Sequence, residues 1–125
     1  LPDVASTGIV GSSMGGLLSL YAFFRQPQQF GFAGALSPAL WYSSAAIFDW
    51  VKNAPFVPGR IYLDSGTREG QRTLANARAM RDLLLEKGYG RGRDLTWVED
   101  VGGVHNEAAW GRRFKKALPF LLGVS

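Results

Sequence analysis

The sequence predicts an α/β fold, with a mostly parallel sheet and helices on both of its faces. Short apolar runs at residues 7–10, 32–37, 60–64 and 95–98 have the length of buried strands. Longer apolar or amphipathic stretches follow them at 14–24, at 74–87 and from about residue 106 onward. Strands that alternate with helices in this way are typical of a parallel sheet covered by helices.

The ends of these elements carry recognisable stop signals. Arg25 and Pro27 close the first helix, Pro38 ends the second strand, and Gly88 stops the second helix. Pro119 is expected to kink the last helix or to end it early. Residues 39–59 are rich in turn signals, and we expect them to be the least regular part of the chain.

Composition indicates one small globular domain. The chain has 125 residues, of which 46% are hydrophobic and 19% are charged, enough apolar material for a core. It has no cysteine, which excludes disulfides, thiolate metal sites and a cysteine nucleophile. We expect no metal, no cofactor and no membrane span, and the localisation stays open between cytoplasm and periplasm.

The basic charge does not predict a nucleic-acid partner. The net charge is +4, but the basic residues are scattered along the sequence. The densest group, Arg112, Arg113, Lys115 and Lys116, flanks the apolar pattern of the last helix and is expected to form its solvated face. The expected partner is therefore a small molecule.

The most informative motif is GSSMGG at residues 11–16, which contains G-x-S-x-G centred on Ser13. In a strand-to-helix turn this motif places its serine in a strained, exposed position, and glycines on either side remove side chains that would collide. A short strand precedes the motif and an apolar helix follows it, which is the order that such a turn requires. We therefore predict that Ser13 is a nucleophile for acyl transfer.

A serine nucleophile needs a base, and the chain contains one histidine, His105. It lies after the last expected strand, in the glycine-containing segment 102–107. The expected third member is a carboxylate between Ser13 and His105 in the chain. Glu69, just beyond the third strand, is the first choice, with Asp64 second and Asp100 third. The loops that carry Ser13, Glu69 and His105 all follow strands, so they meet at one edge of a parallel sheet.

Further residues are candidates for contacts with the substrate. The backbone N–H of Met14, directly after the nucleophile, is expected to donate one hydrogen bond to an oxyanion. Trp41 and Tyr42 follow a strand end and either line a pocket or pack in the core. For Arg68 we favour a surface ion pair, and contact with an anionic group of the substrate is the alternative.

Four segments together resemble the esterase branch of the α/β-hydrolases, which includes siderophore esterases, S-formylglutathione hydrolases, feruloyl esterases and mycolyltransferases. They are the elbow at 9–17, ALSPALW at 35–41, IYLDSGTRE at 61–69 and GVHNEAAW at 103–110. The resemblance implies a serine esterase with Ser13, His105 and Glu69 as its triad, and siderophore-type esters as a candidate substrate class. It also implies that this chain is the C-terminal part of such a domain.

Family members carry several strands and an oxyanion loop before the elbow, whereas six residues precede the first strand here. We therefore expect a partial domain over residues 1–125, with an unpaired sheet edge, a tendency to self-associate and little activity alone. Two alternatives to an esterase stay open: an acyltransferase that uses the same residues, and an inactive truncated chain.

Overall fold

The computed structural model describes residues 3–124 and shows a four-stranded, fully parallel sheet. Its strands are β1 (Gly8–Ser12), β2 (Phe32–Leu36), β3 (Arg60–Gly66) and β4 (Leu95–Asp100), and their order in the sheet equals their order in the chain. The register aligns Ser12 with Leu36 and Leu36 with Asp64. The carboxyl ends of the strands therefore lie at one edge, as the sequence predicts.

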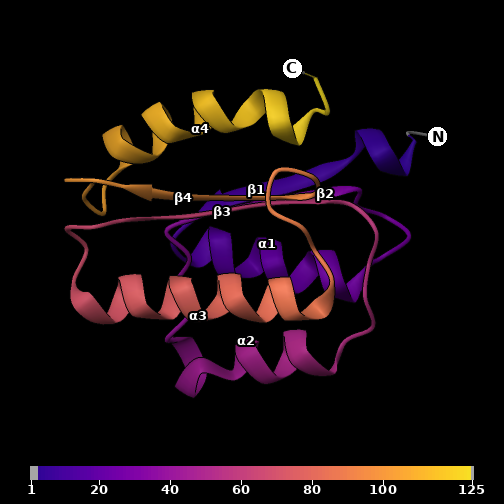
Figure 1. The fold of residues 1–125 in the computed structure, drawn as a ribbon, viewed down its shortest axis with the longest axis horizontal. Helices are drawn as coiled ribbons and strands as arrows, with labels where there is room; N and C mark the ends of the chain where they lie inside the picture. The colour runs from indigo at the N-terminus through magenta and orange to yellow at the C-terminus, as the bar shows by residue number, and fades with distance from the viewer. Residues whose placement is uncertain (1–2, 125) are drawn as a thin grey trace.

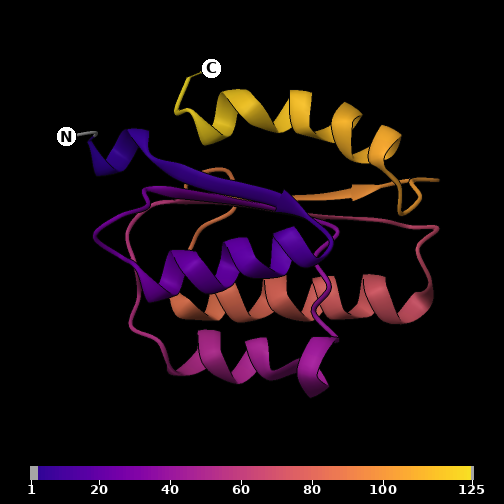
Figure 2. The same cartoon turned by 180° about the vertical axis from the view of Figure 1, so that it is seen from behind.

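Helices cover both faces of the sheet (Figure 1). Helices α1 (Met14–Arg25) and α3 (Gln71–Lys87) pack on one face, and α4 (Glu107–Leu121) packs on the other. Helix α2 (Tyr42–Asn53) contacts α1 and α3 and forms a third layer outside them, which the reverse view also shows (Figure 2). Because the strands are added in one direction, right-handed crossovers place α1, α2 and α3 on the same side.

The core has two parts, one on each side of the sheet. The larger lies between the sheet and helices α1, α2 and α3, where Leu20, Phe23, Ile61 and Met80 have no exposed surface. The smaller lies under α4, where Leu121 packs with residues of β2 and β3. This second cluster fixes α4, and with it the start of that helix, over the carboxyl edge of the sheet.

One expectation about regular structure is wrong, and one of two alternatives for Pro119 is excluded. The segment expected to be irregular contains α2, in which Ile47 and Val51 are buried one helical turn apart. The start of α2 is distorted, because Ser43, Ser44 and Ala45 have left-handed backbone angles with φ between 54° and 60°. Helix α4 runs two residues beyond Pro119, to Leu121, so this proline does not end the helix early, and a kink at Pro119 stays an expectation.

The turn between β1 and α1 depends on close backbone approach at Gly11. A Cβ atom at Gly11 would lie 2.5 Å from the backbone of Gly15, whereas a Cβ at Gly15 would meet nothing within 4 Å. Gly16 is tight as well, since its Cβ would lie 3.1 Å from Pro38. The expectation that glycines on both sides of Ser13 avoid collisions is therefore correct for Gly11 and wrong for Gly15, whose own side chain would have room.

Across residues 3–124, no helix combines the length and the apolar character that crossing a bilayer requires. Within the same residues β1 pairs with a strand on one side alone. Self-association through its other edge stays a prediction.

The glycine geometry predicts that Gly11→Ala destabilises the protein and that Gly15→Ala does not. We expect Gly11→Ala to lower the free energy of unfolding by at least about 1–3 kcal/mol, because the methyl group overlaps backbone that cannot move aside cheaply. Gly15→Ala, the matched control, leaves it unchanged or raises it by up to about 1 kcal/mol, through the better helix propensity of alanine. Denaturant unfolding measures both, and equal effects of the two substitutions would contradict the assigned role of Gly11.

Candidate active site

Ser13 lies in the turn between β1 and α1 with a strained backbone, φ 55° and ψ −117°. Its N–H donates to the carbonyl of Leu36 at 2.9 Å, and its carbonyl accepts the N–H of Ala39 at 3.0 Å. Two hydrogen bonds, one to the last residue of β2 and one to the segment after it, thus hold a conformation that serine rarely adopts. The Ser13 hydroxyl forms no capping bond with α1, so it is available to other groups.

His105 follows β4 and precedes α4. Its Nε2 lies 2.9 Å from Ser13 Oγ, although 92 residues separate the two in sequence. Asn106 begins α4 by accepting the N–H of Ala109 at 2.9 Å, and the ring of Trp110 meets the imidazole edge-to-face at 4.7 Å. The imidazole remains 42% exposed, so a substrate could reach it.

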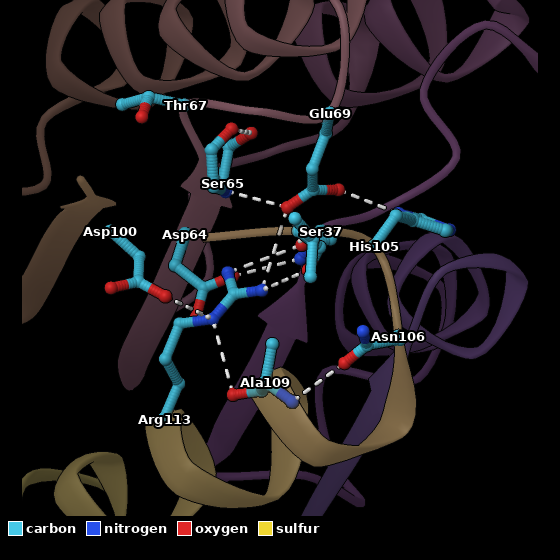
Figure 3. A network of polar contacts seen from close by, with 12 residues as sticks. Ser37, Asp64, Ser65, Thr67, Glu69, Asp100, His105, Asn106, Ala109 and Arg113 are labelled. Carbon is cyan, nitrogen blue, oxygen red and sulfur yellow. Dashed lines mark hydrogen bonds and ion pairs between the residues drawn. The ribbon is translucent and has the colours of Figure 1, made fainter. Parts of the chain in front are cut away.

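Glu69 lies on the other side of the imidazole, on the loop between β3 and α3 (Figure 3). Its Oε1 is 2.6 Å from His105 Nδ1. Its Oε2 accepts hydrogen bonds from Ser37 Oγ and from the Gly66 N–H, both at 2.6 Å. The side chain is 1% exposed, so this carboxylate is held from both sides and shielded from water.

Backbone hydrogen bonds join the loop that carries Glu69 to the loop that carries His105. The N–H of Thr67 donates to the carbonyl of Asp100 at 3.0 Å, and the N–H of Arg68 donates to the carbonyl of Gly103 at 2.9 Å. A Cβ atom at Gly66 would lie 2.3 Å from the carbonyl oxygen of Gly103. The two loops therefore pack directly against each other at Gly66, where a side chain would not fit, and backbone hydrogen bonds hold them together.

The structure does not bring the two alternative carboxylates to His105. Asp64 has no exposed surface and bonds to the Ser37 N–H at 2.8 Å and to the Tyr62 hydroxyl at 2.6 Å. Asp100 accepts from Arg112 Nη2 at 2.6 Å. Of the three candidates, Glu69 is the one that contacts the imidazole.

Burial raises the pKa of the Asp64 carboxyl to about 6, although the Tyr62 hydroxyl, the Arg113 guanidinium and the Ser37 N–H all favour its ionised form. Burial also raises the pKa of Tyr62, and the adjacent Asp64 raises it further. The Tyr62 hydroxyl therefore stays protonated and donates to Asp64. The carboxyl end of β3 thus holds a second titratable group behind the site.

The other candidate residues, Met14, Arg68, Trp41 and Tyr42, are exposed. Met14 is the first residue of α1, where backbone N–H groups have no acceptor within the helix. Arg68 is exposed and makes no ion pair with any residue between 3 and 124, so the expected surface ion pair is not observed. Trp41 and Tyr42 are 53% and 50% exposed, which makes core packing the wrong alternative for both.

Tyr42 lines an apolar groove between α1 and α2, of about 540 Å³, together with Leu17, Leu18, Tyr21 and Trp50. The groove begins at Leu17, one helical turn beyond Met14, the residue that follows Ser13. Trp41 lies beside Tyr42 at the start of α2, with the two rings 6.3 Å apart.

The sequence interpretation missed two residues of the site. Arg113, expected on the solvated face of the last helix, is 2% exposed and points toward Asp64 and Glu69 (Figure 3). That expectation is wrong. The sequence signal for its burial is helical spacing: Arg113 lies three residues after Trp110 and four before the buried Ala117, so it shares their face of the helix. Ser37 has φ 44° and no exposed surface, and only its place after a strand marks it in the sequence.

The arrangement places a hydroxyl, an imidazole and a buried carboxylate in a hydrogen-bonded line. A base that contacts the hydroxyl and is oriented by a third group is the geometry that activates a serine nucleophile. Within residues 3–124, no cluster of three or more His, Asp or Glu side chains could hold a metal ion. The strand–serine–helix turn on a parallel sheet, with the acid and the histidine on later loops, defines the α/β-hydrolase class.

Comparison with known proteins narrows this class. The family model described as "Putative esterase" matches residues 2–121, and the chain belongs to this family. Protein YbbA of Bacillus subtilis is 30% identical over 94% of the chain, which spans 50% of YbbA. The siderophore triacetylfusarinine C esterase of Aspergillus fumigatus is 41% identical over 50 residues, 40% of the chain and 17% of that enzyme.

Solved structures agree with the fold. The enterobactin esterase of Shigella flexneri superimposes with a TM-score of 0.83 at 25% identity, over 97% of the chain and 33% of that protein. The S-formylglutathione hydrolase of Staphylococcus aureus has a TM-score of 0.73 at 18% identity, over 98% of the chain and 53% of that protein, which shows the fold alone. The chain thus spans half the length of its curated relative YbbA and a third of the enterobactin esterase.

The raised pKa of Asp64 predicts a pH dependence of stability. Because the folded protein binds this proton more tightly than the unfolded chain does, protonation of Asp64 stabilises the fold. This contribution is complete below the unfolded pKa of about 3.9 and is lost as the pH rises through the folded value of about 6. The free energy of unfolding of the wild type, relative to Asp64→Asn, should therefore fall between pH 4 and 6. Denaturant unfolding across that range measures it, and a constant difference would contradict the assignment.

Proposed function

We propose that this chain carries the serine, the base and the acid of a carboxylic-ester hydrolase. Ser13 Oγ attacks the ester carbonyl carbon while His105 Nε2 takes the hydroxyl proton. The tetrahedral intermediate collapses, the alcohol leaves with the proton from His105, and an acyl group remains on Ser13. Water, deprotonated by the same imidazole, then releases the acid. The observation that carries the proposal is the line Ser13 Oγ, His105, Glu69, with contacts of 2.9 and 2.6 Å.

The elbow geometry supports the first step. A serine whose hydroxyl is not used to cap its own helix can give its proton to the base without losing a structural bond. Glu69 accepts from Nδ1, which leaves the Nε2 lone pair directed at Ser13, and it stabilises the imidazolium once the proton arrives.

Met14 is the proposed donor to the oxyanion. Its backbone N–H lies in the first turn of α1, where the helix dipole also favours negative charge. Such holes usually contain a second donor from a loop after an earlier strand, and no strand precedes β1 within residues 3–124.

Siderophore-type esters are the proposed substrate class, because two of the relatives are esterases of triacetylfusarinine C and of enterobactin. Trp41, Tyr42 and Arg68 are the exposed side chains proposed to contact the substrate, the aromatic pair through its apolar parts and Arg68 through an anionic group. Hydrolysis of enterobactin and of triacetylfusarinine C, compared with a simple aryl ester, tests the class.

Labelling by a fluorophosphonate probe tests the nucleophile. We expect the wild type to be labelled and Ser13→Ala to lose the label. Ser12→Ala, the matched control at the neighbouring last residue of β1, should keep it. Replacement of the base, His105→Gln, should slow labelling on the order of 10²–10⁴-fold.

Intact-mass spectrometry over time measures these rates. An unlabelled wild type, or a label that survives Ser13→Ala, would reject the proposed function.

A further inference from the structure

Arg113 carries a positive charge into the interior beneath the site. It belongs to the second turn of α4, and 2% of its side chain is exposed. The preceding residue in the chain, Arg112, is 51% exposed and bonds to Asp100 at the surface. Burying an ionised guanidinium is costly unless its hydrogen bonds are satisfied, so the partners of Arg113 show what holds it there.

The guanidinium of Arg113 touches every segment that builds the site except the turn of Ser13 itself (Figure 3). Nη1 lies 2.8 Å from Asp64 Oδ1 and 3.2 Å from Ser37 Oγ. Nη2 lies 3.4 Å from Glu69 Oε2 and 3.4 Å from the carbonyl of Val104. Nε faces Asp100 Oδ2 at 3.3 Å and the carbonyl of Ala109 at 3.4 Å.

Two of these contacts concern the acid and the base directly. The Glu69 oxygen that faces Arg113 is Oε2, the one that does not bind His105. Fixing Oε2 through Arg113, Ser37 and Gly66 sets the direction of Oε1. Val104, the residue before His105, is bonded to the same Nη2, so one nitrogen contacts both the acid and the segment that carries the base.

We propose that Arg113 is a positioning residue of this site: its guanidinium holds the Glu69 carboxylate and the Val104–His105 segment at the distance that the Glu69–His105 hydrogen bond requires. This inference rests on the proposed function of Ser13, His105 and Glu69. The competing role is purely structural, in which Arg113 serves only to neutralise the buried Asp64.

The variants separate these two roles. Arg113→Gln removes the charge and the fork, and Arg112→Gln is the matched control one residue away. Because Arg113→Gln leaves Asp64 buried without its cation and can unfold the protein, Arg113→Gln with Asp64→Asn removes both charges together. Arg113→Lys keeps the charge, but its single ammonium cannot reach the acceptors on both sides of the fork.

Fluorophosphonate labelling rates of the folded variants give the first readout. We expect Arg113→Gln to slow labelling by roughly tenfold to a hundredfold, since a displacement of about 1 Å in a catalytic group has effects of this size. The double variant should stay as slow, Arg113→Lys should be intermediate, and Arg112→Gln should react like the wild type.

The proton NMR signal of the His105 Nδ1–H gives a second readout that needs no catalysis. His105 is the one histidine of the chain, so the signal is unique. A proton held between Nδ1 and Glu69 resonates at low field in the wild type and in Arg112→Gln. We expect it to broaden or vanish in the double variant, whose circular dichroism and thermal unfolding show whether the fold is intact.

Recovery of the wild-type labelling rate and of the low-field signal in the double variant would overturn the proposal, because Arg113 would then serve Asp64 alone. A slow double variant without the signal supports it. If the wild type itself is not labelled, the proposed function fails, whereas the Nδ1–H signal still decides whether Arg113 holds Glu69 against His105.

Discussion

The site depends on how one buried carboxylate, that of Glu69, is held. One of its oxygens faces His105 at 2.6 Å, and the other accepts from a hydroxyl, a backbone N–H and a buried guanidinium. With its side chain 1% exposed, water cannot take the place of these donors. Such fixation turns a flexible glutamate on a loop into a defined partner for the imidazole, because a carboxylate with both oxygens engaged has few other orientations. The three donors, Ser37, Gly66 and Arg113, come from three different segments. These segments must therefore converge for all three donors to reach the Glu69 carboxylate.

Backbone strain at Ser13 is the second constraint, and the parallel sheet supports it. The turn is over-determined by hydrogen bonds from Ser13 to Leu36 and Ala39, so the end of β2 and the segment after it hold Ser13, while the next residue after β2, Ser37, donates a hydrogen bond to Glu69. Ser37 has a left-handed φ as well, and its N–H donates to Asp64. Hydrogen bonds thus join the ends of neighbouring strands, and a substitution at one strand end changes the hydrogen bonding at the others.

Much of this could be predicted from local signals in the sequence. The four strands, the elbow at Ser13 and the loop position of His105 are encoded in short patterns of apolar residues and glycine. The position of Glu69 on the loop just beyond the third strand, rather than within it, favours Glu69 over Asp64. Helix α2 was missed because its start is distorted over Ser43–Ala45 and turn residues surround it. Arg113 was missed because its burial depends on partners 44 to 76 residues away, which no local pattern of charge describes.

The most direct test of this account is the tautomer of His105, read from the nitrogen NMR shifts of its imidazole in the unmodified protein. The geometry predicts that the neutral ring carries its proton on Nδ1, bonded to Glu69, and presents an unprotonated Nε2 to Ser13. Glu69→Gln should abolish this preference while the fold persists. A wild-type ring protonated on Nε2, or one that exchanges freely between the two tautomers, would contradict the account.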